Sequence, residues 1–313
     1  QVQLWKALMV VAVLQLPMAL YQYLFVAQVR SKMNSATAWD AVIGTFQGDS
    51  ASGGDSAAMA IMLLIAMLTA FALWRANKLH RTWMALVVLT GLATLALAEV
   101  KAAVILLPVV IGLYYRRELL QRPIESIVVV ISALLLVGGI FMVYEKLHYG
   151  AASTYTLHKQ PTTNYGRVMR ALDPEAESLG GLELGRVHLL VNWWDINVKS
   201  GDLKHSLFGY GMGSTHASRV GVGELASRYS YVLSRSSTIV LLWETGIVGH
   251  LAFLLVLLSG ARISARVAKN EAIPEIHRVF LRVGSIGLFL LAVTMLYKEF
   301  HFYSNPIQFL MMF

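Results

Sequence analysis

Four basic residues stand where the chain is expected to leave or re-enter a membrane, and their side chains suit phosphate binding. Lys101 interrupts a long apolar stretch, Arg186 begins an amphipathic segment, and Arg219 and Arg235 follow a glycine-rich turn. A guanidinium group binds two phosphate oxygens at once, and an ammonium group binds them as a point charge. A cation near lipid is costly unless it has a partner or a function. Together, these side chains would suit a diphosphate held at a membrane surface.

For each of these cations the alternative is a structural role, as a solvated charge or as half of an ion pair. Lys101 has Glu99 close before it, and Glu244 is within reach of Arg235 if both lie at the start of one helix. Arg228 is most simply interpreted as a solvated charge.

His216 is the candidate general base. An imidazole group changes its protonation state near neutral pH, so it can accept a proton from a hydroxyl group. Glu224 is the other candidate for this role, and the alternative for His216 is an exposed loop histidine without a function. No metal-ligand spacing and no Asp-x-Asp pair is present, so we expect no metal and no other cofactor. The absence of cysteine excludes thiolate and iron–sulfur chemistry.

Glycines alternate in the segment Gly209-Tyr-Gly-Met-Gly-Ser-Thr-His216. The chain has no phosphate loop, no dinucleotide fingerprint and no His-Glu-x-x-His motif, so these glycines do not indicate a nucleotide site. They predict a turn whose backbone N–H groups can approach an anion closely. The alternative is a plain loop that joins two helices.

The elements that must position these residues are apolar. Of the 313 residues, 57% are hydrophobic and 14% are charged, and the mean hydropathy is +0.60. Soluble domains are about 45–50% apolar and about 25% charged. The composition excludes a disordered chain, a coiled coil and almost any water-soluble enzyme of this size, because the surplus apolar surface must face lipid.

Seven membrane crossings are predicted, each from an apolar run that approaches the length of a bilayer. They are Trp5–Ala27, Ala57–Trp74, two short helices within Trp83–Tyr115, Glu125–Tyr144, Ser237–Leu258 and Val279–Tyr297. Lys and Arg gather in the loops near Arg75, Arg116 and Arg262, so the positive-inside rule makes these loops cytoplasmic. The same placement explains most of the formal charge of +8, and we expect no nucleic-acid partner.

The predicted fold class is an all-α polytopic membrane protein, a helical bundle with a large, partly helical periplasmic loop. Residues 1–144 hold crossings one to five, residues 145–235 form the loop subdomain, and residues 236–313 hold the last two crossings and the start of a further helix. Within the loop, the stretch from Leu184 to Val198 predicts an amphipathic helix. Trp193 and Trp194 on this helix suit the membrane interface, and stacking on a sugar ring is the alternative.

The order of these features resembles the O-antigen ligase and O-antigen polymerase superfamily of bacterial envelope proteins. The resemblance rests on Leu207-Phe-Gly-Tyr-Gly-Met-Gly followed by Arg235-Ser-Ser-Thr and then Glu244-Thr-Gly246-Ile-Val-Gly249. Gly185-Arg186 before a Trp-containing helix, Glu99-Val-Lys101 between two crossings and Gly44-Thr-Phe46 are similar to other family segments. The family's histidine at the mouth of the sixth crossing is Arg235 here, and the arginine of its Ser-Arg-Gly segment is Lys101.

The resemblance implies a GT-C-like glycan transferase, a polysaccharide polymerase or ligase, in the bacterial inner membrane. The donor would be a glycan on undecaprenyl diphosphate, and the acceptor would be a hydroxyl group on a second glycan or a lipid. It implies a diphosphate clamp of Arg186, Arg219 and Lys101 with support from Arg235, and His216 or Glu224 as the base that replaces the missing histidine. Glu99, Glu244, Trp193 and Trp194 are possible supporting residues. Membrane lipids are the remaining expected partner.

Two other classes of function stay open. A transporter of polysaccharide or lipid-linked oligosaccharide would fit the crossings, although the sequence has no internal repeat and its candidate charges lie at one face. A non-catalytic assembly or sensor protein would explain the missing histidine. The chain starts and stops close to apolar runs, so we expect it to be part of a longer protein.

Overall fold

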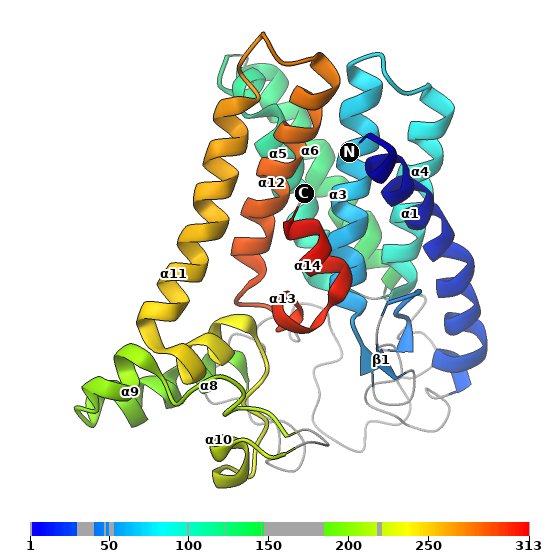
Figure 1. Ribbon diagram of the computed structural model, residues 1–313. Coiled ribbons are helices and arrows are strands. Elements are labelled where there is room, and N and C mark those ends of the chain that lie inside the picture. Colours follow the sequence, from blue (N-terminus) through cyan, green and yellow to red (C-terminus); the bar gives the residue numbers. More distant parts are fainter. Residues whose placement is uncertain are drawn as a thin grey trace. The chain divides into compact units, whose positions relative to one another are not determined.

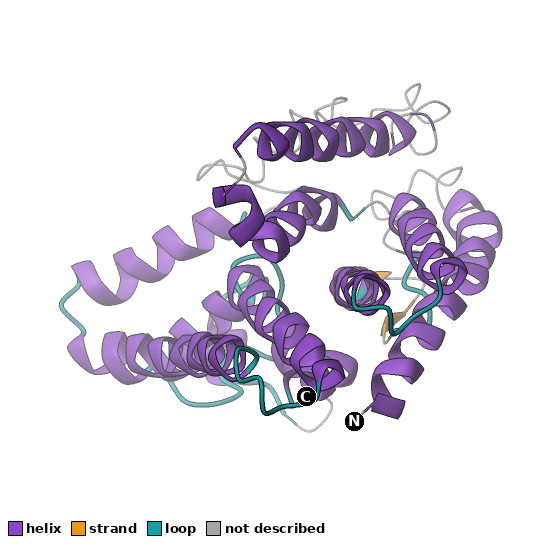
Figure 2. Ribbon diagram, turned by 90° about the horizontal axis from the view of Figure 1, so that it is seen from above, coloured by secondary structure: helices purple, strands orange, loops and turns teal. Residues whose placement is uncertain are grey.

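The computed structural model describes residues 2–29, 41–46, 48–49, 53–98, 100–121, 123–144, 146, 185–217 and 221–312 (Figure 1). Within these ranges the chain is mainly helical, and the strands β1 (Gly48–Asp49) and β2 (Gly53–Gly54) pair antiparallel (Figure 2). The chain forms two compact units. The first comprises Gln1–Tyr155, Gly260–Leu290 and Ser304–Phe313, and the second comprises Thr156–Ser259 and Leu291–Tyr303.

The first unit is a helical bundle. Its complete helices are α1 (Val2–Gln22), which continues as the π-helix η1 (Tyr23–Ala27), α3 (Ser56–Arg75), α4 (Arg81–Ala98), α5 (Lys101–Gln121), α6 (Pro123–Tyr144) and α14 (Asn305–Met311). Helix α3 lies at the centre, since it packs against α1, α4, α5 and α14 and is buried along most of its length. Its Ala, Met, Leu and Ile side chains surround the helix, as expected of a helix that is enclosed by its neighbours.

A short segment after α1 is bound to that helix by two buried glutamines. Gln22 accepts hydrogen bonds from the backbone N–H groups of Ile43 (3.0 Å) and Gly44 (2.7 Å) and donates one to the Gly44 carbonyl (2.9 Å). Gln15 accepts from the N–H of Thr45 at 2.8 Å and donates to its hydroxyl at 2.8 Å. The amides thus satisfy backbone groups that would otherwise be buried without partners.

Ion pairs join the ends of helices at one end of the first unit. Arg75 pairs with Glu118 at 2.8 Å, and Lys78 pairs with Glu275 at 3.1 Å. Both pairs are exposed, so each contributes little stability, about 0–1 kcal/mol. They connect three segments that the sequence assigns to the same side of a membrane.

The second unit consists of shorter helices around the beginning of a long one. Its elements are α8 (Arg186–Trp193), the π-helix η4 (Trp194–Lys199), α9 (Leu203–Phe208), α10 (Glu224–Arg228) and α13 (Phe300–Tyr303). Helices α11 (Ser237–Val267) and α12 (Glu275–Thr294) each contribute residues to both units.

The core of the second unit forms where α8, α10 and the first turns of α11 meet. Leu189, Trp193, Leu225, Ile239 and Trp243 are buried in one cluster. The indole N–H of Trp193 donates to the Leu242 carbonyl at 3.0 Å. The interface prediction is therefore corrected for Trp193, whose ring packs into the unit's own core, whereas Trp194 is exposed.

Five helices of the described residues are long and apolar enough to cross a membrane: α1 with η1, α3, α4, α11 and α12. This is compatible with a membrane protein. Helices α5 and α6 form where the fourth and fifth crossings are predicted, but α5 begins at a lysine and carries Arg116, Arg117 and Glu118 near its end. The further helix expected to begin at the end of the sequence is present as α14, which extends from Asn305 to Met311.

Candidate functional site

The glycine-rich turn is bound to the backbone of α11 at a break in that helix. The N–H of Tyr210 donates to the Trp243 carbonyl at 2.8 Å, and the N–H of Gly211 donates to the Glu244 carbonyl at 2.9 Å. In a continuous helix these carbonyls would accept from residues four positions later. The helix is interrupted at Gly246, where φ is 66° and ψ is −168°, so the turn supplies the missing donors.

Gly209 and Gly246 allow this contact because neither has a side chain. A Cβ atom at Gly209 would lie 2.4 Å from the Glu244 carbonyl carbon, and one at Gly246 would lie 2.3 Å from the Leu207 carbonyl carbon. Both glycines have positive φ angles, 71° and 66°. The glycine-rich turn that begins at Gly209 and the Glu-x-Gly segment at Gly246 are therefore in direct backbone contact with each other.

Glu244 is buried beneath the turn, and its carboxylate contacts Thr215 and His216 at the end of the turn. The oxygen Oε1 accepts from the hydroxyl group of Thr215 at 2.6 Å and from its backbone N–H at 3.3 Å. The Nδ1 atom of His216 lies 3.4 Å from the same oxygen. The Arg235 pairing considered for Glu244 is thus replaced by contacts to Thr215 and His216.

The Thr215 hydroxyl also determines which nitrogen of His216 carries the proton. Its oxygen lies 2.8 Å from Nδ1 of His216. A hydroxyl group has one proton, and an ionised carboxylate can only accept, so the Thr215 proton points to Glu244. The oxygen then offers only lone pairs to His216, and Nδ1 must be protonated to form the short contact. In neutral His216 the nitrogen with the lone pair is therefore Nε2, and none of the described residues forms a hydrogen bond with it.

Tyr303 lies beside His216. Its hydroxyl oxygen is 3.1 Å from Nδ1 of His216, and the two ring centres are 4.6 Å apart. Burial raises the pKa of Tyr303, and the charges of Glu244 and Glu299 raise it further. Tyr303 therefore stays a neutral phenol at physiological pH, with its hydroxyl oxygen on the Nδ1 side of the His216 ring.

His301 fixes the short helix that carries Tyr303. Its Nε2–H donates to the Leu291 carbonyl at 2.8 Å, and its Nδ1 accepts from the Ser237 hydroxyl group at 2.7 Å. Burial lowers the pKa of His301 to about 4, so the ring is neutral at physiological pH. This histidine connects α13 to the first residue of α11 and acts structurally.

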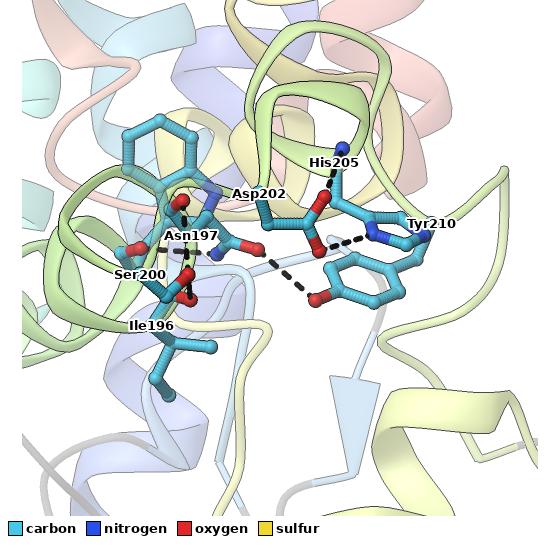
Figure 3. A network of polar contacts seen from close by, with 7 residues as sticks. Ile196, Asn197, Ser200, Asp202, His205 and Tyr210 are labelled. Carbon is cyan, nitrogen blue, oxygen red and sulfur yellow. Dashed lines mark hydrogen bonds and ion pairs between the residues drawn. The ribbon is translucent and has the colours of Figure 1, made fainter.

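A second polar network supports the turn from the other side (Figure 3). The Tyr210 hydroxyl group donates to Oδ1 of the buried Asn197 at 3.0 Å, and its ring stacks on His205 with centres 4.0 Å apart. Asp202 caps α9 and binds Nδ1 of His205 at 2.6 Å. The hydrogen bonds from the His205 side chain and backbone lower the pKa of Asp202. Tyr210 is thus held on both its backbone and its side chain.

The predicted cations that the structure describes belong to different units. Arg186 begins α8, and its guanidinium carbon lies 5.0 Å from the ring centre of Tyr297. Arg235 is half-buried two residues before α11, and Lys101 begins α5 in the first unit. Arg219 and Glu99 lie outside the described residues.

The remaining candidate residues differ in how far their side chains are exposed. Glu224 is exposed on α10, whereas His216 is partly buried. Trp193 is buried in the core, and Trp194 presents an exposed ring. Within the described ranges, no three His, Asp or Glu side chains are grouped closely enough to hold a metal ion.

Sequence reasoning missed Thr215 and Tyr303. Thr215 precedes His216 directly, and Tyr303 belongs to a run of aromatic and polar residues, Glu299-Phe-His-Phe-Tyr303. A polar run next to an apolar crossing was the available signal. His216 and Tyr303 are 87 positions apart in the sequence, which gave no indication that the two rings touch.

The hydroxyl group of Thr215 can be tested separately from the packing of its side chain. We expect Thr215→Val, which keeps the shape but removes the hydroxyl group, to convert neutral His216 from the Nδ1–H form to a mixture of both tautomers. Thr215→Ser should retain the Nδ1–H form. Nitrogen-15 NMR of histidine-labelled protein measures this, with His216→Gln identifying the signal among nine histidines. A wild-type His216 that carries its proton on Nε2 would contradict the assignment.

The fold and the site together define a helical protein with candidate membrane-spanning helices and a His–Thr–Glu cluster under a glycine-rich turn. Comparison with protein-family models, with characterised proteins and with solved structures finds no match to this chain.

Proposed function

We propose that this chain is a metal-independent glycan transferase of a cell membrane, a polysaccharide polymerase or ligase. The donor is a glycan on undecaprenyl diphosphate, and the acceptor is a hydroxyl group of a second glycan or a lipid at the periplasmic face of the bacterial inner membrane. The observation that carries the proposal is the environment of His216. Thr215 and Glu244 orient its ring so that a basic nitrogen, Nε2, is free for an acceptor hydroxyl group.

In this reaction Nε2 of His216 takes the proton of the acceptor hydroxyl group. The hydroxyl oxygen attacks the anomeric carbon of the donor and forms the new glycosidic bond. The bond from that carbon to the diphosphate oxygen breaks, and the electron pair leaves with the diphosphate. A single displacement inverts the anomeric centre. General base catalysis of this kind contributes about 10²- to 10⁴-fold to a rate.

The buried Glu244 stabilises the proton that His216 gains. Its negative charge reaches the imidazolium through the Thr215 hydroxyl group, as a carboxylate does in other histidine–carboxylate pairs. The Tyr303 hydroxyl lies beside Nδ1, on the side of the ring away from Nε2, and helps to hold the ring in place. Diphosphate is a good leaving group, so the protein must mainly position the acceptor and stabilise negative charge.

Arg186 is the described arginine that we assign to the diphosphate. Its position over the ring of Tyr297 holds the guanidinium plane, and guanidinium groups bind phosphate oxygens bidentately. Arg219, Arg235 and Lys101 remain predicted members of the clamp from the sequence.

Arg186→Gln provides the test, with Arg228→Gln as the matched control on the exposed end of α10. Purified protein in vesicles receives a donor glycan on undecaprenyl diphosphate, and the lengths of the product chains are measured. We expect Arg186→Gln to lower transfer at least tenfold and to leave donor units unpolymerised on the periplasmic side. Equal transfer by wild type and Arg186→Gln would overturn the role of Arg186. No transfer by wild type would overturn the enzyme proposal.

A transporter of lipid-linked glycan is the second candidate because α11 is interrupted within a candidate crossing. Interrupted helices form the binding sites of many transporters. In this chain the Trp243 and Glu244 carbonyls near the interruption accept hydrogen bonds from the N–H groups of Tyr210 and Gly211. These carbonyls therefore bind the glycine-rich turn, and a substrate is not needed to satisfy them. Donor units that remain on the cytoplasmic side in the Arg186→Gln variant would favour the transporter.

A further inference from the structure

Helix α9 and the turn after it expose large apolar side chains next to one another in the chain. Leu203 is 73% exposed, Phe208 is 64% exposed and Met212 is 79% exposed, and Leu207 is also exposed. Single exposed apolar residues are ordinary, but a contiguous group indicates an interaction surface. We name Leu203, Leu207, Phe208 and Met212 the α9 face.

Helix α11 changes its environment at the Gly246 break. The side chains from Ser237 to Glu244 are buried. After the break, Val248, Leu251 and Leu255 are exposed, on a helix long and apolar enough to cross a membrane. The exposed apolar surface of α11 therefore begins directly after Gly246, and lipid is the partner that fits it.

The α9 face is attached to α11 at this same point. The backbone of Leu207 and Phe208 lies against Gly246, so close that a Cβ atom there would be 2.3 Å from the Leu207 carbonyl carbon. The short helices α8 and α9 lie near the end of α11 that holds its first residues (Figure 1). The α9 face therefore lies beside the point on α11 at which the exposed apolar surface of that helix begins.

Two lysines border this apolar group. Lys204 is exposed on α9. The side chain of Lys199, at the end of η4, is 65% exposed and pairs with Asp195 at 2.6 Å. Lysine side chains at an interface place their stems along apolar surface and their ammonium groups near anionic lipid headgroups. This combination of charge and apolar surface distinguishes a lipid surface from a purely apolar protein contact.

We propose that α9 and the turn after it insert into one leaflet of the membrane, with the α9 face among the acyl chains and Lys199 and Lys204 at anionic headgroups. This anchor is separate from the transfer chemistry and holds the second unit at the lipid surface. It takes the interfacial role that the sequence assigned to the helix near Leu184.

The absence of cysteine allows a direct measurement of depth. Phe208→Cys and Met212→Cys carry a nitroxide spin label, and Ser230→Cys, an exposed polar position in the same unit, is the control. The full chain is placed in vesicles of phosphatidylethanolamine and phosphatidylglycerol. Collisions of the label with oxygen, which enters lipid, are compared with collisions with a water-soluble nickel chelate.

We expect the ratio of oxygen to nickel collisions to be at least threefold higher at Phe208 and Met212 than at Ser230. Replacing both lysines by glutamine should reduce that ratio, and more so in anionic than in neutral vesicles. Ratios equal to that of Ser230 would overturn the proposal. Exclusion of both reagents would overturn it too, since it indicates a protein partner or a second copy. No glycan is needed, so a failure here is independent of the proposed transfer.

Discussion

Replacing His216 by glutamine is expected to lower the rate of glycan transfer by about 10²- to 10⁴-fold, the contribution of a general base. Glutamine keeps a polar group near Thr215 but has no nitrogen that can take the acceptor proton. The donor should still bind, because the residues assigned to the diphosphate are unchanged. The measurement compares single-turnover transfer rates with the affinity for donor in vesicles that contain each protein.

His80→Gln is the matched control for this prediction. His80 is an exposed histidine of the first unit, with a hydrogen bond to the Thr82 hydroxyl group. This variant should transfer glycan at the wild-type rate. A His216→Gln protein that transfers as fast as His80→Gln would show that another group takes the proton, and Glu224 would then be the first residue to test.

Replacing Gly246 by alanine is expected to destabilise the second unit by roughly 3 kcal/mol or more, the combined effect of a strained backbone and of overpacking. The backbone at Gly246 has φ 66° and ψ −168°, a region that only glycine adopts readily. The added Cβ would also meet the backbone of Leu207 and Phe208. Gly209→Ala should behave alike, since its Cβ would meet the backbone of Glu244 and Thr245.

Thermal unfolding in detergent measures this effect, and Gly284→Ala is the control. Gly284 is in helix α12, and a Cβ atom there would meet nothing within 4 Å. That change should leave the melting temperature unchanged or raise it, because alanine is favoured over glycine within helices. A Gly246→Ala protein that melts with wild type would mean that the turn does not depend on the break in α11.

The helices could be predicted from sequence because apolar runs of membrane length leave few alternatives. The stretch around Trp193 shows the limit of that reasoning. A helix face that packs into a protein core and one that enters lipid have the same spacing of apolar residues, so the sequence could not separate them. The structure assigns the first role to α8 and exposes the apolar residues of α9 instead.

The candidate site was predictable in its parts but not in its connections. His216, Glu244 and the glycines were each recognised as separate features. Their contact depends on two chain segments about 30 residues apart that meet through backbone atoms, and backbone contacts leave little trace in residue type. Thr215 is an ordinary residue in most loops, and its role follows only from the position of its hydroxyl group between a carboxylate and an imidazole.

The two glutamines of α1 constrain how this protein is assembled. Without the segment that follows it, α1 would carry the amides of Gln15 and Gln22 into the bilayer with most of their hydrogen bonds missing, because within the helix only Gln15 donates, to the Val11 carbonyl at 3.1 Å. Each unsatisfied group costs several kcal/mol there. Those amides are satisfied by the segment around Gly44, which emerges later during synthesis. Insertion of α1 is therefore completed only when the residues that follow it have folded back onto it.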